Sequence, residues 1–238
     1  MRKALWMGVF LLVVAIAPSL ALADGSYTFF GSASYVSPGY NSNRAVLLTS
    51  DANANPQLFS GIDFTFPSGM LLSSLSTLST YYDFTASTCG QGSPRFAISL
   101  AAYPNATIFV YIVSPSNQNC TENAWINTGN LLDGSVYTDN VEPHGFYDWT
   151  GPLYNTWADV VKQYGSQTVS DIFLVSDAGP SGSQTVQIDN TYVNTTLYSY
   201  EPTKISDCKN GGWQTFTFAP GPFKNEGACV SYFAKQPR

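Results

Sequence analysis

Residues 168–194 read TVSDIFLVSDAGPSGSQTVQIDNTYVN. The first part is apolar on successive residues from Ile172 to Val175, which is typical of a strand buried on both sides. The second part alternates apolar Val186 and Ile188 with polar residues, the period of a strand with one buried face. A segment rich in glycine, proline and serine separates them. The stretch therefore predicts two strands joined by a loose hairpin that closes an all-β domain.

Shorter patterns before this stretch predict further strands. Apolar residues alternate with polar ones at Ile62, Phe64 and Phe66, and a Pro-Ser-Gly turn follows. Sequential strands usually pair, so we expect the last two strands of this set to lie side by side. The expected strands are Tyr27–Phe30, Ala45–Thr49, Ile62–Phe66, Leu72–Phe84, Arg95–Leu100 and Thr107–Val113.

One helix is expected, between Thr156 and Gly165. Thr156 and Asp159 have the spacing of a capping box, with the carboxylate reaching back to the first turn. Gly165 is expected to end the helix in the left-handed conformation. One apolar face is formed by Trp157, Val160, Val161 and Tyr164. A single short helix beside a sheet leaves the domain all-β.

The first 23 residues have the pattern of a secretory signal peptide. Arg2 and Lys3 precede an apolar run, and Ala21-Leu22-Ala23 is a typical cleavage site. The alternative is a membrane anchor. A spanning helix needs about 20 apolar residues, however, and Pro18 interrupts this run before it reaches that length. We therefore expect a secreted, extracellular protein with no membrane span after cleavage.

The composition indicates a globular β protein. Only 11% of the residues are charged and 15% are aromatic, whereas disordered chains lack aromatic residues. With Arg2 and Lys3 removed from the 10 basic residues, 8 remain against 16 acidic ones. Nucleic acid and anionic membranes need a basic patch, so neither is expected as a partner. The sequence leaves the oligomeric state open.

Four cysteines are an even number, as expected of an exported protein. Three pairings exist, and chain order favours Cys89–Cys120 and Cys208–Cys229. The alternative is a metal site. It is disfavoured because no pair has Cys-x-x-Cys spacing and His144 is the only histidine.

The order from Trp157 through DIFLVSDAG to QTVQIDNTYVN resembles the C-terminal half of jelly-roll carbohydrate-binding modules. Their last strand often follows a pattern that this chain carries at Val186, Ile188, Asp189, Asn190 and Val193. The resemblance covers Gly61–Asn194 and implies a jelly-roll-like β-sandwich. It also implies that Asp189 helps to hold a structural calcium. The alternative is an aspartate that accepts backbone hydrogen bonds at a strand end. No other cofactor is expected.

The segment Cys208–Val230, CKNGGW…FKNEGACV, is similar to the C-terminal tail of uncharacterised secreted prokaryotic proteins. Ser206 and Asn225 are each expected to cap a short helix. A Cys208–Cys229 bond would staple these pieces around three aromatic residues, Trp213, Phe216 and Phe223. The tail is interpreted either as an attachment module or as a stapled cap. The expected divisions are a signal peptide (1–23), a β-sandwich (24–197) and a disulfide-stapled tail (198–238).

Residues 120–151 form a long irregular segment rich in aromatic residues. Long loops of this kind are often functional. Flat aromatic rings cover the apolar faces of sugars, which makes glycan the expected ligand of a non-catalytic binding protein. The alternative is that these rings anchor the loop to the core. The candidate ligand-binding residues are Trp125, Tyr137, Tyr147 and Trp149.

Two other functions remain open. A glycoside hydrolase needs two carboxylates facing one sugar bond, and Glu122, Glu142 and Asp148 lie in the irregular segment. Nothing in their spacing demands this chemistry, and Gly-x-Ser-x-Gly and nucleotide-binding loops are absent from the sequence. No catalytic residue is therefore assigned. The third function is a structural or adhesive surface subunit that assembles through strand edges.

Three sequons for N-glycosylation occur, at Asn105, Asn119 and Asn194. They predict exposed positions. They have meaning only in a source that has the glycosylation machinery.

Overall fold

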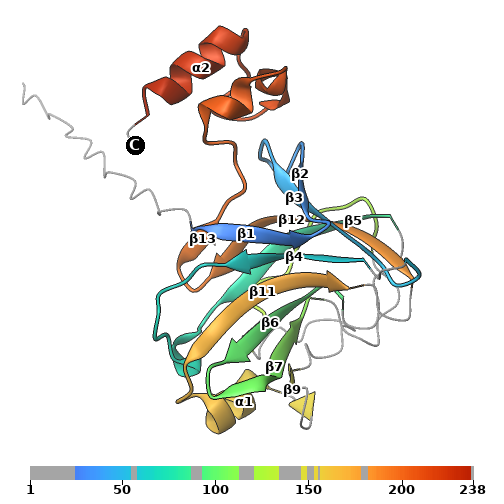
Figure 1. Cartoon of the computed structure of the whole chain (residues 1–238), viewed down its shortest axis with the longest axis vertical. Helices are drawn as coiled ribbons and strands as arrows, with labels where there is room; N and C mark the ends of the chain where they lie inside the picture. Colours follow the sequence, from blue (N-terminus) through green and yellow to red (C-terminus); the bar gives the residue numbers. More distant parts are fainter. Residues whose placement is uncertain are drawn as a thin grey trace, which may run out of the picture.

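The computed structural model describes residues 25–54, 58–86, 93–112, 121–133, 146–148, 153–154, 156–177 and 182–236. Its main body consists of two antiparallel sheets that pack face to face, and the C-terminal segment extends beyond one end of them (Figure 1). The all-β sandwich expected from the sequence is confirmed. No helix in the described part of the chain is long and apolar enough to cross a membrane.

Among the described residues, sheet A has seven strands, and its central strands face the viewer in Figure 1. In spatial order its strands are β1 (Tyr27–Gly31), β4 (Phe59–Phe64), β11 (Val169–Asp177), β6 (Arg95–Leu100), β7 (Tyr103–Tyr111), β9 (Phe146–Asp148) and β10 (Leu153–Tyr154). As predicted, β6 and β7 are antiparallel neighbours.

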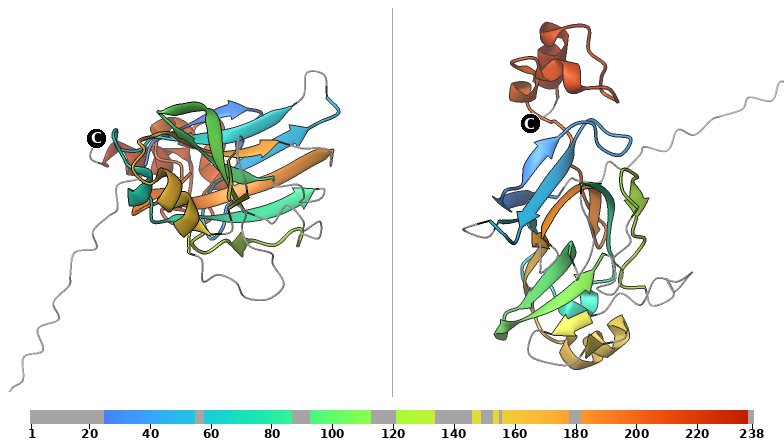
Figure 2. Two further views of the ribbon diagram at one scale, coloured as in Figure 1. Left: turned by 90° about the horizontal axis from the view of Figure 1, so that it is seen from below. Right: turned by 90° about the vertical axis from the view of Figure 1, so that its right-hand side faces the viewer.

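Sheet B has six strands in the part of the chain that the structure describes. In spatial order they are β2 (Ser34–Val36), β3 (Ala45–Asp51), β12 (Ser183–Val193), β5 (Leu78–Ala86) and β8 (Ile126–Asn127), with β13 (Thr196–Tyr198) paired to the end of β12. Figure 2 shows the two layers from the side and from below.

The strand order is that of a jelly roll. The strands β3, β12, β5 and β8 of sheet B face β4, β11, β6 and β7 of sheet A. Along the chain, β3, β4, β5 and β6 alternate between the sheets, and so do β11 and β12. This is the double Greek-key winding of eight-stranded jelly rolls, and it agrees with the fold class expected from the sequence.

The prediction that the two strands of residues 168–194 pair with each other as a hairpin is wrong. Both strands exist, but β11 pairs with β4 and β6, whereas β12 pairs with β3 and β5 in the other sheet. Leu174 of β11 and Ile188 of β12 are both fully buried and belong to the same core. The connection therefore turns the chain from one layer to the other, so the two apolar faces meet across the core.

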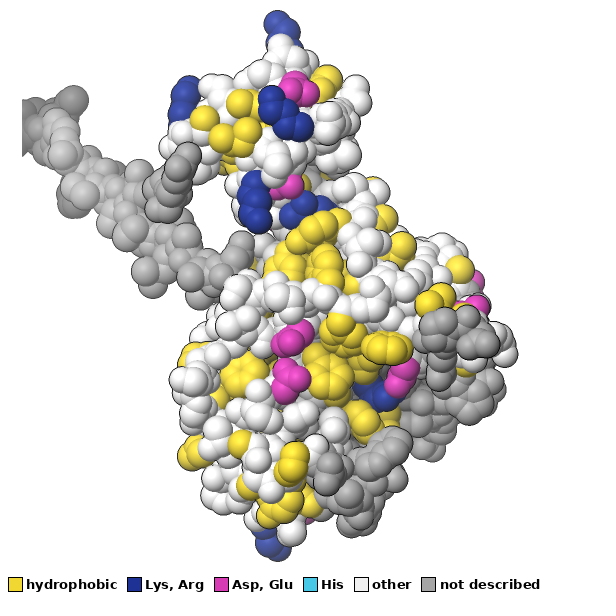
Figure 3. All heavy atoms as spheres, viewed as in Figure 1, with side chains coloured by type: hydrophobic (Ala, Val, Ile, Leu, Met, Phe, Trp, Pro, Cys, Tyr) yellow, Lys and Arg dark blue, Asp and Glu magenta, His cyan; other side chains and the backbone are white. Residues whose placement is uncertain are grey.

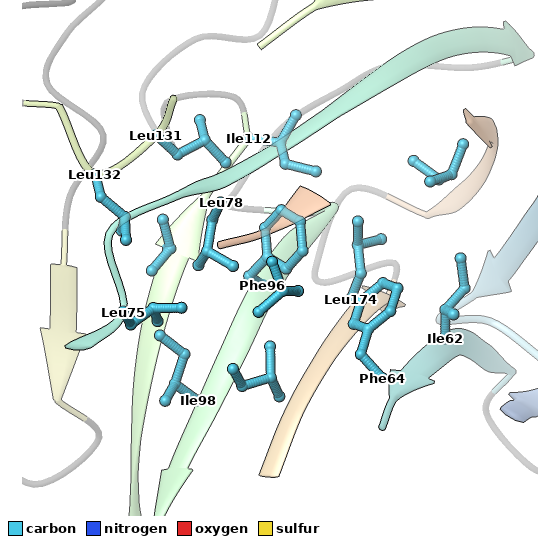
Figure 4. Packing of buried hydrophobic residues seen from close by; sticks show 14 of the residues in the cluster. Ile62, Phe64, Leu75, Leu78, Phe96, Ile98, Ile112, Leu131, Leu132 and Leu174 are labelled. Atoms are coloured by element: carbon cyan, nitrogen blue, oxygen red, sulfur yellow. The ribbon is translucent and has the colours of Figure 1, made fainter. Parts of the chain in front are cut away.

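The core between the sheets follows from the alternation of each strand. Ile62 and Phe64 of β4, Phe96 of β6 and Leu174 of β11 all point into the same layer (Figure 4). The rings of Phe64 and Phe96 have centroids 6.1 Å apart. Burial of such side chains is the main stabilising term of the sandwich, at about 25 cal/mol per Å² of apolar surface.

The strand predicted at Leu72–Phe84 begins later than expected. Leu72–Ser74 forms the 3₁₀ helix η1, and β5 starts at Leu78. The hydroxyl of Ser74 donates to the carbonyl oxygen of Leu71 at 2.7 Å. Leu72 and Leu75 are both buried, so their three-residue spacing fits a tight turn rather than a strand.

The helix α1 (Trp157–Tyr164) is confirmed, with Thr156 as its N-cap. The Thr156 hydroxyl accepts from Asp159 N at 3.2 Å and donates to the Asp159 carboxylate at 2.7 Å. The left-handed conformation expected of Gly165 is wrong, because its φ is −58° and its ψ is −28°. Glycine is required there for space, since a Cβ would collide with the carbonyl oxygen of Val161.

The C-terminal segment has a hydrophobic cluster of its own. It contains η2 (Ile205–Cys208), η3 (Gly212–Thr215) and α2 (Glu226–Ala234). The predicted Cys208–Cys229 disulfide is present, and its sulfurs are buried with Phe216. Asn225 caps α2 as predicted, with its side chain accepting from Ala228 N at 2.8 Å. Ser206 caps no helix, because it lies inside η2. The second predicted disulfide, Cys89–Cys120, lies outside the described residues.

Two residues just before β3, Asn43 and Arg44, hold this segment to the sandwich. Asn43 Nδ2 donates to Glu201 Oε2 and to the carbonyl oxygen of Ala219, both at 2.8 Å. Its Oδ1 accepts from Phe218 N at 2.7 Å. Arg44 donates from Nε to the carbonyl oxygen of Tyr200 and from Nη2 to that of Glu201.

The sandwich core extends slightly beyond the boundary expected at residue 197. Tyr198 and Tyr200 are fully buried members of the main cluster. The hydroxyl of Tyr198 donates to the carbonyl oxygen of Thr65 at 2.6 Å. Side chains from the start of the segment expected at 198–238 therefore contribute to the core of the sandwich.

Candidate ligand-binding site

The site lies on the outer face of sheet B, where residues 39–44 fold over the sheet. Asp189 of β12 anchors this loop. Its Oδ2 accepts from Tyr40 N at 2.8 Å and from Ser42 Oγ at 2.5 Å. Its Oδ1 accepts from Asn190 N at 2.7 Å. A Cβ on Gly39 would lie 2.5 Å from Asp189 Oδ2, so the loop approaches the carboxylate closely only because residue 39 is glycine.

Burial sets the ionisation of this anchor. The Asp189 side chain is 1% exposed, and the loss of water raises its pKa from 3.8 to about 6. The three donors favour the carboxylate and reduce the shift, while the nearby charge of Glu201 adds to it. The anchor therefore changes its protonation state in mildly acidic solution.

The anchored loop places Tyr40 on Tyr81. The two rings are stacked, with centroids 4.0 Å apart and an angle of 17° between their planes. Tyr81 faces outward because it alternates along β5 with Thr80 and Tyr82, which are buried. Trp125 lies next to this pair, with its ring centroid 6.0 Å from that of Tyr40.

Beside the stacked rings is an open pocket of about 370 Å³, which is within the range of small-ligand sites. Asn41 and Asn190 have positive φ values of 49° and 46°, a conformation that asparagine tolerates better than most residues. Their side-chain amides form no hydrogen bond within the described part of the chain. The pocket is lined by Tyr40, Asn41, Ser79, Tyr81, Asn127, Asn190 and Tyr192. We call these seven residues the Tyr40–Tyr81 site.

Of the aromatic residues predicted to bind ligand, Trp125 lies beside this site, in contact with Tyr40. Tyr147 lies in β9 of sheet A, opposite Phe109 in the register. Tyr137 and Trp149 lie outside the described residues. Tyr40, Tyr81 and Tyr192, which line the pocket, were not among the ligand-binding residues predicted from the sequence. The available indication was the run Ser79–Asp83, in which Tyr81 shares the outward face with polar residues.

The carboxylates considered for glycoside hydrolysis are not brought together in the described part of the chain. Glu122 is exposed and forms an isolated bridge with Phe84 of sheet B. Asp148 belongs to β9 of sheet A and pairs with Ile108. Glu142 and His144 lie outside the described residues.

The structure shows Asp189 as an acceptor of hydrogen bonds from its own chain, the alternative considered from the sequence. Both of its oxygens are engaged in this way. The described residues contain no group of three or more histidine, cysteine, aspartate or glutamate side chains suited to a metal. A calcium role for Asp189 stays a prediction, which melting with and without EDTA checks.

The side chain of Asn194, which is the acceptor residue of a sequon, also forms hydrogen bonds that stabilise the fold. Its Oδ1 accepts from Ser76 N at 2.7 Å and from Thr77 N at 3.4 Å, and its Nδ2 donates to the carbonyl oxygen of Ser74 at 3.1 Å. A sugar on Nδ2 would disturb the last bond. Asn105 lies in β7, and Asn119 lies outside the described residues. Glycosylation at the three sites stays a prediction.

We expect Asn194→Ala to lower the free energy of unfolding by about 2 kcal/mol. Two backbone N–H groups lose their acceptor, and alanine is strained at the φ of 54° observed here. Asn194→Gly is the matched control, because it loses the same bonds without the strain and should be about 1 kcal/mol less damaging. Urea unfolding measures both. Equal stability of the three proteins would contradict the anchoring role.

Comparison of the chain with models of protein families, with curated proteins and with solved structures finds no match.

Proposed function

We propose that this chain is a secreted, non-catalytic protein that binds carbohydrate at the Tyr40–Tyr81 site. The observation that supports this most directly is the stacked pair of tyrosines beside a pocket lined by two asparagine side chains, which form no hydrogen bond with the described residues. The proposal keeps the ligand class expected from the sequence and moves the site from the irregular segment to the outer face of sheet B.

The chemistry of the pocket suits a polyhydroxylated ligand. A sugar ring has an apolar C–H face that packs on an aromatic ring, and hydroxyl groups at its rim that need hydrogen-bond partners. Tyr192 and Tyr81 supply aromatic surface and phenolic hydroxyls. Asn41 and Asn190 supply both donors and acceptors without a net charge. This combination favours a neutral sugar over a charged metabolite.

Secretion is supported by the chemistry of the C-terminal segment. The Cys208–Cys229 disulfide is typical of oxidising compartments. It agrees with the signal peptide expected at residues 1–23. The resemblance to jelly-roll carbohydrate-binding modules is consistent with the same function, since the strand order is that of a jelly roll.

We expect Tyr192→Ala to weaken carbohydrate binding about tenfold or more, which corresponds to about 1.4 kcal/mol. The substitution removes an aromatic wall of the pocket but leaves the backbone of β12 paired. A glycan array with plant, microbial and host polysaccharides identifies the ligand, and calorimetric titration then measures its affinity for both proteins.

Tyr103→Ala is the matched control. Like Tyr192, Tyr103 is a tyrosine on a strand, and its side chain is 43% exposed. It lies in β7 of sheet A, however, where its ring contacts that of Tyr164. Its loss should leave the affinity unchanged. Absence of binding to every polysaccharide, or equal loss in both variants, would contradict the proposal.

A further inference from the structure

The outer face of sheet A carries aromatic side chains. The ring centroid of Phe30 lies 5.8 Å from that of Phe173 and 6.1 Å from that of Phe59, and Phe59 is 50% exposed. The ring of Phe30 lies close to Gly61, where an added Cβ would collide with it. Figure 3 shows hydrophobic side chains gathered around acidic ones on this face. Large exposed apolar patches typically mark interaction sites.

Two carboxyl groups lie beside these rings. Asp63 is the register partner of Phe173, and Asp171 precedes Phe173 by two positions on the same face of β11. Burial and the neighbouring Asp63 raise the pKa of Asp171. Neither carboxyl group forms an ion pair with a lysine or arginine of the described residues. They border an open hollow of about 680 Å³, which is also lined by Phe66, Ser99 and Pro104. We call Phe30, Phe59, Phe173, Asp63 and Asp171 the sheet-A face.

The C-terminal segment presents the complementary chemistry. Phe218 and Tyr232 are each 39% exposed, and the ring of Tyr232 contacts those of Phe223 and Phe233. Lys224 and Lys235 are exposed at the two ends of α2 and form no ion pair within the described part of the chain. Figure 3 shows basic and hydrophobic side chains together on this segment.

Charge is distributed unevenly along the chain. Of the 16 acidic residues, all but Glu201, Asp207 and Glu226 precede residue 201. Residues 24–200 contain only three basic residues, Arg44, Arg95 and Lys162. The C-terminal segment has five, which are Lys204, Lys209, Lys224, Lys235 and Arg238. The sandwich is thus strongly acidic and the segment is basic, so the two attract each other.

A chain does not bring its own C-terminal segment onto its own sheet-A face in this structure. The bonds from Asn43 and Arg44 fix the segment at the β2–β3 end of the molecule. Figures 1 and 2 show it beyond the end of the sandwich rather than over sheet A. The complementary surfaces therefore point to a contact between two molecules.

We propose that the sheet-A face receives the C-terminal segment of a second copy of this chain. A lysine at one end of α2 enters the hollow beside Asp63 and Asp171, and the exposed aromatic rings of the segment pack on Phe30, Phe59 and Phe173. The two surfaces differ, so the contact is head-to-tail and extends into open chains unless the rotation closes a ring.

Sedimentation velocity of the mature chain over a range of concentrations tests this contact. A face variant carries Asp63→Lys and Asp171→Lys, and a tail variant carries Lys224→Glu and Lys235→Glu. We expect the wild type to associate, more weakly at high salt, and each variant alone to associate at least about tenfold more weakly. Mixing the two variants should restore association, because each reversed surface then meets a reversed partner.

Lys162→Glu is the control for a change of net charge, because Lys162 is exposed on α1, away from both proposed surfaces. This variant should associate like the wild type. If the face variant does not fold by circular dichroism, Asp63→Asn with Asp171→Asn replaces it for the single-variant comparison. A wild type that stays monomeric at every concentration overturns the proposal. So does a tail variant that associates like the wild type, or a mixture that associates no better than its components.

Discussion

Replacing Asp189 with asparagine is expected to remove about 3 kcal/mol of pH dependence from the free energy of unfolding. The pKa of Asp189 is about 6 in the folded protein, against 3.8 for an ordinary aspartate. Each pKa unit corresponds to about 1.4 kcal/mol. Between these two values the folded state binds more protons than the unfolded state, so the contribution of this group to stability falls as the pH rises.

The difference in stability between the wild type and Asp189→Asn isolates this contribution. It should be constant below pH 3.8, fall by about 3 kcal/mol as the pH rises through about 6, and be constant again above that. Burial also raises the pKa values of Asp83 and Asp171. Both residues are present in the wild type and in the variant, so their contributions to the pH dependence cancel in the difference. Urea unfolding at several pH values measures the difference. A difference that does not change with pH would show that Asp189 is not a desolvated carboxyl group.

Replacing both Cys208 and Cys229 with serine is expected to unfold the C-terminal segment and leave the sandwich folded. The disulfide closes a loop with a sequence separation of 21 residues, for which the chain-entropy model gives about 3 kcal/mol. In the described part of the segment, the fully buried side chains of the cluster are Phe216 and the two cysteines, and four partly buried apolar side chains pack against them. A core of this size is too small to fold alone. The sandwich has a separate and much larger core.

Hydrogen exchange measures this outcome locally. In the variant, the amides of α2 should lose protection while those of β5, β11 and β12 keep it. Asn225→Ala serves as a milder control, because it removes only the N-cap of α2 and should cost about 1 kcal/mol. Protection of α2 equal to that of the wild type would contradict the dependence on the disulfide. Loss of protection throughout sheet B would show that the two parts fold as one unit.

The features that could be predicted from the sequence are those that depend on neighbouring residues. The alternation around Val186 and Ile188 identified β12, and the spacing of Thr156 and Asp159 identified the start of α1. The pairing Cys208–Cys229 followed from chain order. In each case the pattern and the interaction lie within one segment of the chain.

Strand pairing could not be predicted in the same way. The alternation of a strand indicates which side is buried but not which strand lies beside it. The strands β11 and β12 are adjacent in sequence and carry compatible patterns, so a hairpin was the simplest interpretation. The jelly roll instead separates them into two sheets, because Leu174 and Ile188 fill the core from opposite sides.

The site depends on contacts that no local pattern contains. Tyr40 reaches Tyr81 because its backbone is held by Asp189, which is 149 residues away in the chain. The sequence directed attention to the aromatic residues of a long irregular segment, and among those that the structure describes, Trp125 lies beside the site and Tyr147 lies in sheet A. The outward position of Tyr81 was available from its alternation with Thr80 and Tyr82, but its stacking partner was not.

Titration of the isotope-labelled mature chain with a soluble oligosaccharide, followed by NMR, tests the central claim most directly. The oligosaccharide is taken from the polysaccharide that binds best on the array. We predict saturable shifts of the signals of Tyr40, Tyr81, Asn190 and Tyr192, with those of Tyr103 unchanged. Shifts confined to other residues would contradict the account, and so would the absence of any saturable shift.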